Sequence, residues 1–125
     1  MFRQITPFVP CSDLSAQVAF YRDRLGFVVG YRADGYAFLR RDAVAIRLIE
    51  VWAEDAPGLR DKEQSIYIDV EDVDALWAEL APRLADLPAG RVRAPFDQDY
   101  GQRELHVLDE DCTLIFFGAP VAAQP

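Results

Sequence analysis

Residues 66–84, IYIDVEDVDALWAELAPRL, carry the pattern that decides the fold. An alternating apolar run is followed by Asp72 and then by apolar residues at helical spacing, which predicts a strand that leads directly into a helix. Residues 5–25, ITPFVPCSDLSAQVAFYRDRL, repeat this order, with a strand predicted at residues 5–9 and a helix at residues 14–25. The sequence therefore predicts one structural unit that occurs twice, and the two halves must pack together.

Three further strands are predicted after each helix. In the first half they are residues 27–32, 36–40 and 43–51, with Asp34-Gly35 as a hairpin turn. The second half is predicted to contain a strand at 65–70, a helix at 72–84 and strands at 91–96, 102–108 and 113–117.

These elements divide the chain into four parts. Residues 3–52 form the first module, residues 53–64 a linker that contains Pro57-Gly58, and residues 65–118 the second module. Residues 119–125 are predicted to be a flexible tail. The modules are too small to fold separately, so residues 1–125 are expected to form a single domain.

Composition limits the possible functions. Hydrophobic residues make up 51% of the chain, which predicts a substantial core, but no segment has the continuous apolar length of a membrane span. The first residues lack the apolar run of a signal peptide, which favours a cytoplasmic location. Cys11 and Cys112 have no metal-type spacing and are interpreted as two reduced thiols.

The net charge of −8 argues against nucleic acid as a partner, because an acidic surface repels the phosphate backbone. The same charge would attract a cationic small molecule. The alternative interpretation is that the acidic residues only keep the protein soluble.

Side-chain alternation assigns residues to the two faces of the predicted sheet. Ile66, Ile68 and Val70 are expected to pack under the second helix, which leaves Tyr67 and Asp69 on the opposite face. By the same parity, the inward residues are Ala37, Leu39, Val44, Ile46 and Leu48, and the outward residues are Tyr36, Phe38, Ala45, Arg47 and Ile49. Aromatic, basic and acidic side chains mixed on one face are typical of a small-molecule cleft.

Four segments together resemble the vicinal oxygen chelate superfamily, which groups glyoxalases, extradiol dioxygenases and bleomycin resistance proteins. They are VPCSDLSAQVAFYRDRLGF at 9–27, GYAFLRR at 35–41, IYIDVEDVDALWAEL at 66–80 and YGQRELHVLDEDCTLIFFG at 100–118. The last segment is similar to the bleomycin resistance branch, in which a Gly, an Arg-Glu-Phe and an Asp-Pro-Asp-Gly recur. In this chain Leu105 replaces the Phe, Glu110 the Pro and Cys112 the Gly.

The resemblance implies an α+β fold in which two βαβββ modules form a curved mixed sheet around a cleft, with the helices outside. Metal-using members carry ligands on the first and fourth strands of each module. The positions in this chain that align with those ligands are Thr6, Arg47, Ser65 and Phe116, and none of them is a histidine or a carboxylate. Since divalent metals need such donors, we expect no metal and no other cofactor in the cleft.

The sequence also offers two candidates for a general base. His106 is the only histidine and shares strand parity with Gln102 and Glu104, but no nucleophile or second base has an evident spacing with it. A structural or surface role is therefore favoured for His106. Asp69 is interpreted as a polar contact for a ligand or for Arg47.

The resemblance, together with the absent metal ligands and the acidic charge, implies a bleomycin-resistance-type protein that binds and sequesters a small, cationic, aromatic ligand without chemical turnover. The resemblance implies a homodimer with a cleft between subunits, while composition and net charge predict no membrane or nucleic-acid partner. Trp52 is expected either in the groove wall or in a subunit interface, and the aligned Arg47 would also suit an anionic ligand. Two alternatives are a divergent lyase, isomerase or dioxygenase and a binder of another metabolite. The expected ligand-binding residues are Tyr31, Phe38, Arg47, Trp52, Tyr67, Asp69, Phe96, Tyr100, Glu104 and Phe116.

Overall fold

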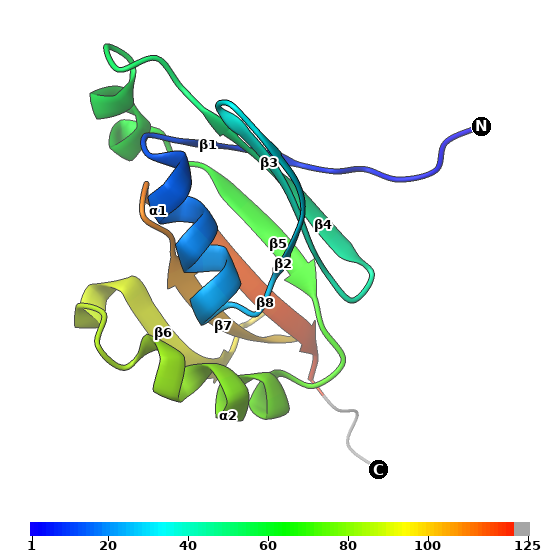
Figure 1. The fold of residues 1–125 in the computed structure, drawn as a ribbon. Coiled ribbons are helices and arrows are strands. Elements are labelled where there is room, and N and C mark those ends of the chain that lie inside the picture. Colours follow the sequence, from blue (N-terminus) through cyan, green and yellow to red (C-terminus); the bar gives the residue numbers. More distant parts are fainter. Residues whose placement is uncertain (122–125) are drawn as a thin grey trace.

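The computed structural model describes residues 1–121 and contains the order strand, helix and three strands twice (Figure 1). The first module consists of β1 (Phe8–Cys11), α1 (Leu14–Ala19), a π-helical turn (Phe20–Arg24), β2 (Val28–Ala33), β3 (Tyr36–Arg41) and β4 (Val44–Glu50). A 3-10 helix (Ala56–Asp61) lies in the linker. The second module consists of β5 (Ser65–Asp69), α2 (Val73–Leu84), a 3-10 turn (Ala89–Arg91), β6 (Val92–Asp97), β7 (Gln102–Leu108) and β8 (Leu114–Pro120).

The eight strands form two mixed sheets. The first sheet has the order β1-β4-β3-β2 and the second the order β5-β8-β7-β6. In each sheet the first strand of the module pairs in parallel with the fourth, and the other neighbours are antiparallel. The α+β class and the repeated module are as expected, but the strands form two separate four-stranded sheets rather than one continuous curved sheet.

Both helices begin where the sequence predicts. The side chains of Asp13 and Asp72 accept hydrogen bonds from the backbone N–H groups of Ala16 and Ala75, at 3.1 and 3.0 Å, and so satisfy donors that the first turn leaves free. Pro82 lies inside α2, which continues to Leu84 as predicted. Pro82 is exposed, so the carbonyl that loses its intrahelical partner can bond to water.

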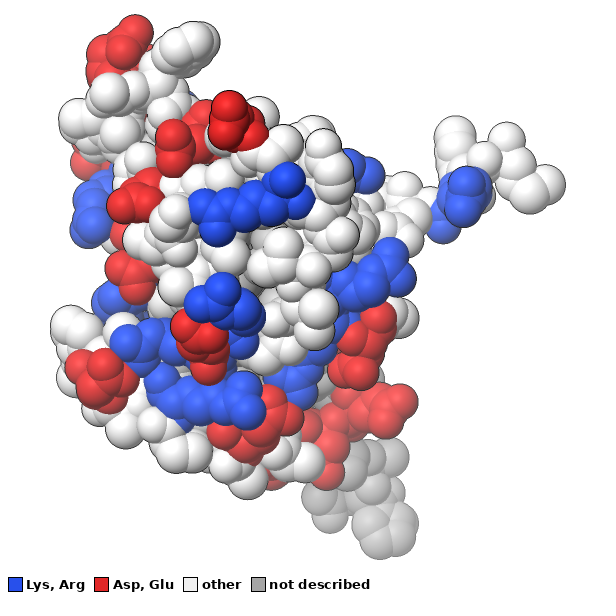
Figure 2. Space-filling model, viewed as in Figure 1, with Lys and Arg blue, Asp and Glu red and all other residues white. Residues whose placement is uncertain are grey.

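The first strand also differs from the prediction. A strand was expected at residues 5–9, but β1 begins at Phe8, and Ile5 is 94% exposed. Pro7 has no backbone N–H to donate to β4, so it marks the point where the chain leaves the sheet. The residues before it form an arm that extends from the body (Figures 1 and 2).

The predicted tail is also partly wrong. The last strand was expected to end at residue 117, but β8 runs to Pro120 and Ala119 is buried. The remainder of the predicted tail, residues 122–125, lies outside the described residues. The other predicted strands shift by one residue or less at each end.

The core lies between the sheets and the helices, and the alternation of side chains predicts it well. Leu39, Ile46 and Leu48 of the first sheet are buried, as are Leu105 and Ile115 of the second. Trp77 on α2 is partly buried against this core. Among residues 1–121 no helix is long and apolar enough to cross a membrane.

The turn between β7 and β8 ties the two modules together. Asp111 accepts hydrogen bonds from the backbone N–H and the hydroxyl of Ser12, at 3.0 and 2.6 Å. The hydroxyl of Tyr21 donates to Asp109 at 2.8 Å, and both side chains are buried. These long-range contacts join the first half of the first module to the end of the second module.

Candidate functional site

Each sheet has one face covered by a helix and one open face. Helix α1 packs on β3 and β4, and α2 packs on β6, β7 and β8. The side chains on the opposite sides alternate with the buried core residues, as the sequence analysis expects. The open face of the first sheet carries Tyr31, Tyr36, Phe38 and Arg47, and that of the second carries Tyr67, Phe96, Glu104, His106 and Phe116.

Four rings form a continuous row across all four strands of the second sheet. Phe96 on β6 meets His106 on β7 edge to face, with ring centroids 4.9 Å apart. His106 lies 4.3 Å from Phe116 on β8, and Phe116 stacks on Tyr67 of β5 at 5.6 Å. We call Phe96, His106, Phe116 and Tyr67 the ring row. It is a half-buried aromatic surface of the kind that stacks on flat ligands.

Glu104 lies beneath the ring row and contacts His106 and Tyr67. Its side chain is fully buried and accepts hydrogen bonds from the hydroxyl of Tyr100 at 2.6 Å and from Gln98 Nε2 at 3.0 Å. His106 Nε2 lies 2.9 Å from Glu104 Oε1. Burial raises the pKa of Glu104, but hydrogen bonds from Tyr100, His106, Gln98 and Tyr67 outweigh burial and lower the pKa to about 2.

Glu104 is therefore ionised at neutral pH, which fixes the chemistry of its neighbours. A carboxylate only accepts hydrogen bonds, so His106 Nε2 carries a proton. The pKa of Tyr100 is raised to about 12, first by its hydrogen bond to Glu104 and then by burial. The open face of the second sheet thus has a fixed negative charge beneath an aromatic surface.

The open face of the first sheet combines rings with arginine. The guanidinium of Arg47 lies 5.1 Å from the centroid of the Phe38 ring and donates a hydrogen bond to the hydroxyl of Tyr36. Tyr36 in turn lies 6.1 Å from Tyr31, ring centroid to centroid. Arg47 is one of the two partners expected for Asp69, the other being a ligand. Among the described residues Arg47 bonds to Tyr36, and no bond between Arg47 and Asp69 is found.

The structure thus brings most of the expected ligand-binding residues onto two surfaces. Tyr31, Phe38 and Arg47 share the first open face; Tyr67, Phe96, Tyr100, Glu104 and Phe116 share the second. It does not bring Trp52 to either group. Trp52 follows the end of β4, is 76% exposed, and lines a separate hollow with Leu59 and Lys62.

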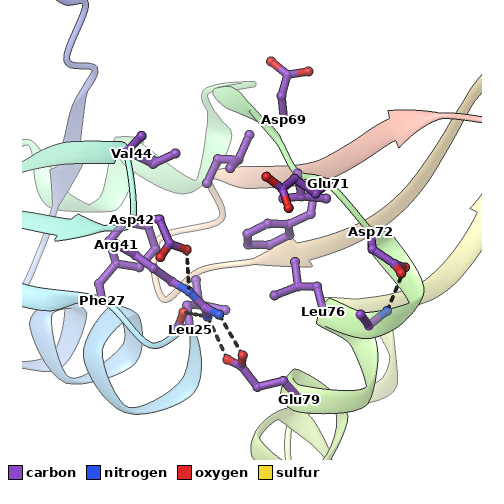
Figure 3. Close-up of a pocket in the computed structure, with 15 residues that line it drawn as sticks. Leu25, Phe27, Arg41, Asp42, Val44, Asp69, Glu71, Asp72, Leu76 and Glu79 are labelled. Carbon is purple, nitrogen blue, oxygen red and sulfur yellow. Dashed lines mark hydrogen bonds and ion pairs between the residues drawn. The ribbon is translucent and has the colours of Figure 1, made fainter.

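Asp69 shares strand parity with Tyr67 on β5, so it lies on the open face of the second sheet, beside the Tyr67 end of the ring row. Its backbone borders a groove of about 640 Å³ between the modules, and Figure 3 shows its carboxylate pointing away from that groove. Arg41 spans the groove with a two-pronged ion pair to Glu79, at 2.7 and 2.8 Å, and a bond to the carbonyl of Leu25. The groove lies on the helix side of the second sheet, where Ile68 and Phe117 form part of its lining. Arg41 therefore serves as a contact between modules.

The residues that could hold a metal are dispersed. Over residues 1–121 no group of three or more histidine, cysteine or carboxylate side chains lies close enough to bind an ion. Of the aligned ligand positions, Phe116 belongs to the ring row and Arg47 contacts Tyr36 and Phe38. Cys11 and Cys112 are free thiols, and burial followed by the nearby Asp111 raises the pKa of Cys11 to about 12.

Four residues at the open face of the second sheet are absent from the expected ligand-binding set. They are His106, for which a structural or surface role is favoured, and Gln98, Gln102 and Arg93. Gln102 Nε2 donates to the hydroxyl of Tyr67 at 2.8 Å, and Gln98 bonds to Glu104. The parity of His106 with Glu104 was the only available signal, because the ring contacts depend on pairing between strands distant in sequence.

Comparison with known proteins agrees with this architecture. The model of the glyoxalase/bleomycin resistance protein/dioxygenase superfamily matches residues 3–115. A bleomycin resistance protein of Geobacillus stearothermophilus is 31% identical over 127 residues, which cover 91% of this chain and 94% of that protein. A bleomycin resistance protein of Staphylococcus aureus matches with the same identity and coverage.

Solved structures show the same fold. A bleomycin-binding protein complexed with bleomycin has a TM-score of 0.78 and 24% identity, with coverage of 94% of this chain and 98% of that chain. The bleomycin-binding protein from bleomycin-producing Streptomyces verticillus, complexed with copper(II)-bleomycin, has a TM-score of 0.79 and 24% identity, with coverage of 99% and 98%.

Proposed function

Because the chain belongs to the glyoxalase/bleomycin resistance protein/dioxygenase superfamily, we propose that it binds a bleomycin-type drug and sequesters it unmodified. Two similar proteins named for bleomycin resistance and two similar folds solved with bleomycin support this choice within the superfamily. The proposal includes no metal, no cofactor and no chemical turnover.

The ring row is the observation that carries the proposal. Phe96, His106, Phe116 and Tyr67 give a flat, partly exposed aromatic surface, and the ionised Glu104 lies buried beneath it. Rings over a buried negative charge favour a flat, positively charged ligand. The net charge of −8 adds a general attraction for cations.

The proposal extends to a homodimer with a site between subunits. Large side chains on the two open faces remain accessible in a single chain, including Tyr31 at 60% and Tyr67 at 41%. The N-terminal arm likewise exposes Phe2 and Ile5 almost completely. A second copy would cover these apolar surfaces and close the site. We expect light scattering to give about twice the monomer mass of 14.1 kDa, whereas the monomer mass at micromolar concentration would contradict the dimer.

A cytoplasmic location belongs to the same proposal. Expression of the chain in a drug-sensitive bacterium tests the function. We expect growth at bleomycin concentrations that kill the control strain, and intact drug when the purified complex is denatured and analysed by mass spectrometry. Recovery of a modified drug would show an enzyme instead.

A further inference from the structure

An irregularity in β6 places two residues on the open face that regular alternation would separate. In the pairing of β6 with β7, Arg93 lies opposite His106 and Phe96 opposite Glu104. Two residues of β6, Ala94 and Pro95, therefore lie opposite the single residue Leu105 of β7, so β6 contains one extra residue and forms a β-bulge there. Because His106 and Glu104 both point to the open face, the bulge turns Arg93 and Phe96 to that face together.

The consequence is a stacked pair at one end of the ring row. The guanidinium carbon of Arg93 lies 3.4 Å from the centroid of the Phe96 ring, which is contact distance for a flat cation on an aromatic face. Arg93 is exposed, so this contact is made at the surface. Phe96 itself contacts His106, so the guanidinium occupies the outer end of the ring row.

We infer that the Phe96 end of the ring row is a binding position for a flat cation, and that Arg93 is its intramolecular occupant. This inference rests on the proposed function, because it names the part of the same surface that selects the charge and shape of the ligand. A flat cationic group of a ligand must displace Arg93 to stack on Phe96. Arg93 therefore lowers the affinity for such ligands, and it leaves ligands that bind elsewhere on the row unaffected.

The test uses thioflavin T, a flat cationic dye, and an uncharged 2-phenylbenzothiazole of similar shape. Arg93→Gln removes the guanidinium, and Arg93→Lys keeps the charge but replaces the flat group by a compact ammonium ion. Since loss of any arginine makes the protein more acidic, Arg22→Gln on the surface of the first module is the charge-matched control. Arg22 is exposed and pairs with its neighbour Asp23.

We expect Arg93→Gln to bind thioflavin T about two- to fivefold more tightly than Arg22→Gln, with Arg93→Lys between wild type and Arg93→Gln. The uncharged compound should show a smaller gain. Equal affinity in Arg93→Gln and Arg22→Gln, or weaker binding in Arg93→Gln than in wild type, would overturn the inference. The latter result would show that Arg93 clamps the ligand rather than competes with it.

A double-mutant cycle locates the effect on Phe96. In a Phe96→Ala background, Arg93→Gln should produce no gain in thioflavin T affinity beyond that of Arg22→Gln, and a persistent gain would overturn the inference. Titration with bleomycin separates this result from the proposed function. If bleomycin binds but Arg93→Gln does not change the affinity for the dye, the proposed function stands and the inference is rejected. If Arg93→Gln tightens dye binding but bleomycin does not bind, the dye site stands and the proposed function is rejected.

Discussion

Tyr67 lies flat over Gly118, so closely that a Cβ atom at position 118 would overlap the Tyr67 hydroxyl. The same Cβ would also lie 3.1 Å from the Cγ atom of Glu104. Because Gly118 has no side chain, the Tyr67 ring can lie at this end of the ring row, next to the buried carboxylate of Glu104. This relationship links the backbone of β8 to the surface that we propose binds the ligand.

Gly118→Ala should displace the Tyr67 ring and break its hydrogen bond with Gln102. We expect a loss of about 1 kcal/mol of bleomycin affinity, the scale of one aromatic stacking contact, or roughly fivefold in Kd. Calorimetry measures the change, and circular dichroism checks that the fold is retained. Gly58→Ala is the matched control, because a Cβ there meets no neighbouring atom. Equal affinities in the two variants would show that Tyr67 does not contribute.

Acid should destabilise the protein partly through Glu104. The pKa of its carboxyl group is lowered from 4.5 to about 2 in the folded chain, so the folded state binds fewer protons than the unfolded state in this range. The stability that Glu104 contributes is complete above pH 4.5 and is lost as the pH falls from there toward 2. Thermal unfolding between pH 3 and pH 7 should therefore show a shallower acid decline in Glu104→Gln than in wild type. Parallel declines would contradict the account of this network.

Phe38 and Trp52 should differ in their effect on the drug. Phe38 lies on the first open face beside Arg47, so Phe38→Ala should weaken bleomycin binding by about 1–2 kcal/mol. Trp52 lies beyond β4 in a separate hollow, so Trp52→Ala should change Kd by less than about twofold. Calorimetric titration of both variants with bleomycin under identical conditions measures the two losses of affinity. A larger loss in Trp52→Ala than in Phe38→Ala would place the binding site near the linker instead.

Loss of the Tyr21 hydroxyl should weaken the junction between the modules. Burial raises the pKa of Asp109, and the hydrogen bond from Tyr21 opposes that effect. Tyr21→Phe leaves the buried Asp109 with one donor fewer, which should cost about 1–3 kcal/mol of unfolding free energy in urea. Tyr31→Phe, at an exposed position of the first sheet, serves as the control. A Tyr21→Phe variant as stable as the control would show that Asp109 finds a replacement donor.

Part of this site could be predicted from the sequence, because side chains alternate between the two faces of a strand. Strand parity places Phe38, Arg47 and Tyr67 on open faces, because the period of two is a local property of the chain. It fails at β6, where the bulge at Pro95 reverses the parity between Arg93 and Phe96. The contacts of His106 with Phe96 and Phe116 depend on strand pairing across the module, which no local pattern contains.

Pro82 shows how context can outweigh a local signal. Proline disfavours a helix interior, but α2 continues through it to Leu84, because proline near an exposed helix end leaves a carbonyl that water can satisfy. Trp52, at the end of the fourth strand, is predicted either in the groove wall or in a subunit interface. In a single chain it is 76% exposed and lines a hollow apart from both open faces, and its place in an interface stays a prediction.

The most direct test of the account is a calorimetric titration of the purified chain with metal-free bleomycin. At roughly 100 μM protein, any Kd of about 10 μM or tighter gives a saturating curve. We predict saturable binding with about one drug per chain, which weakens as salt is added because salt screens the attraction between the acidic protein and a cationic ligand. Absence of heat with bleomycin across a range of temperatures, from protein that is folded and dimeric, would contradict the central claim.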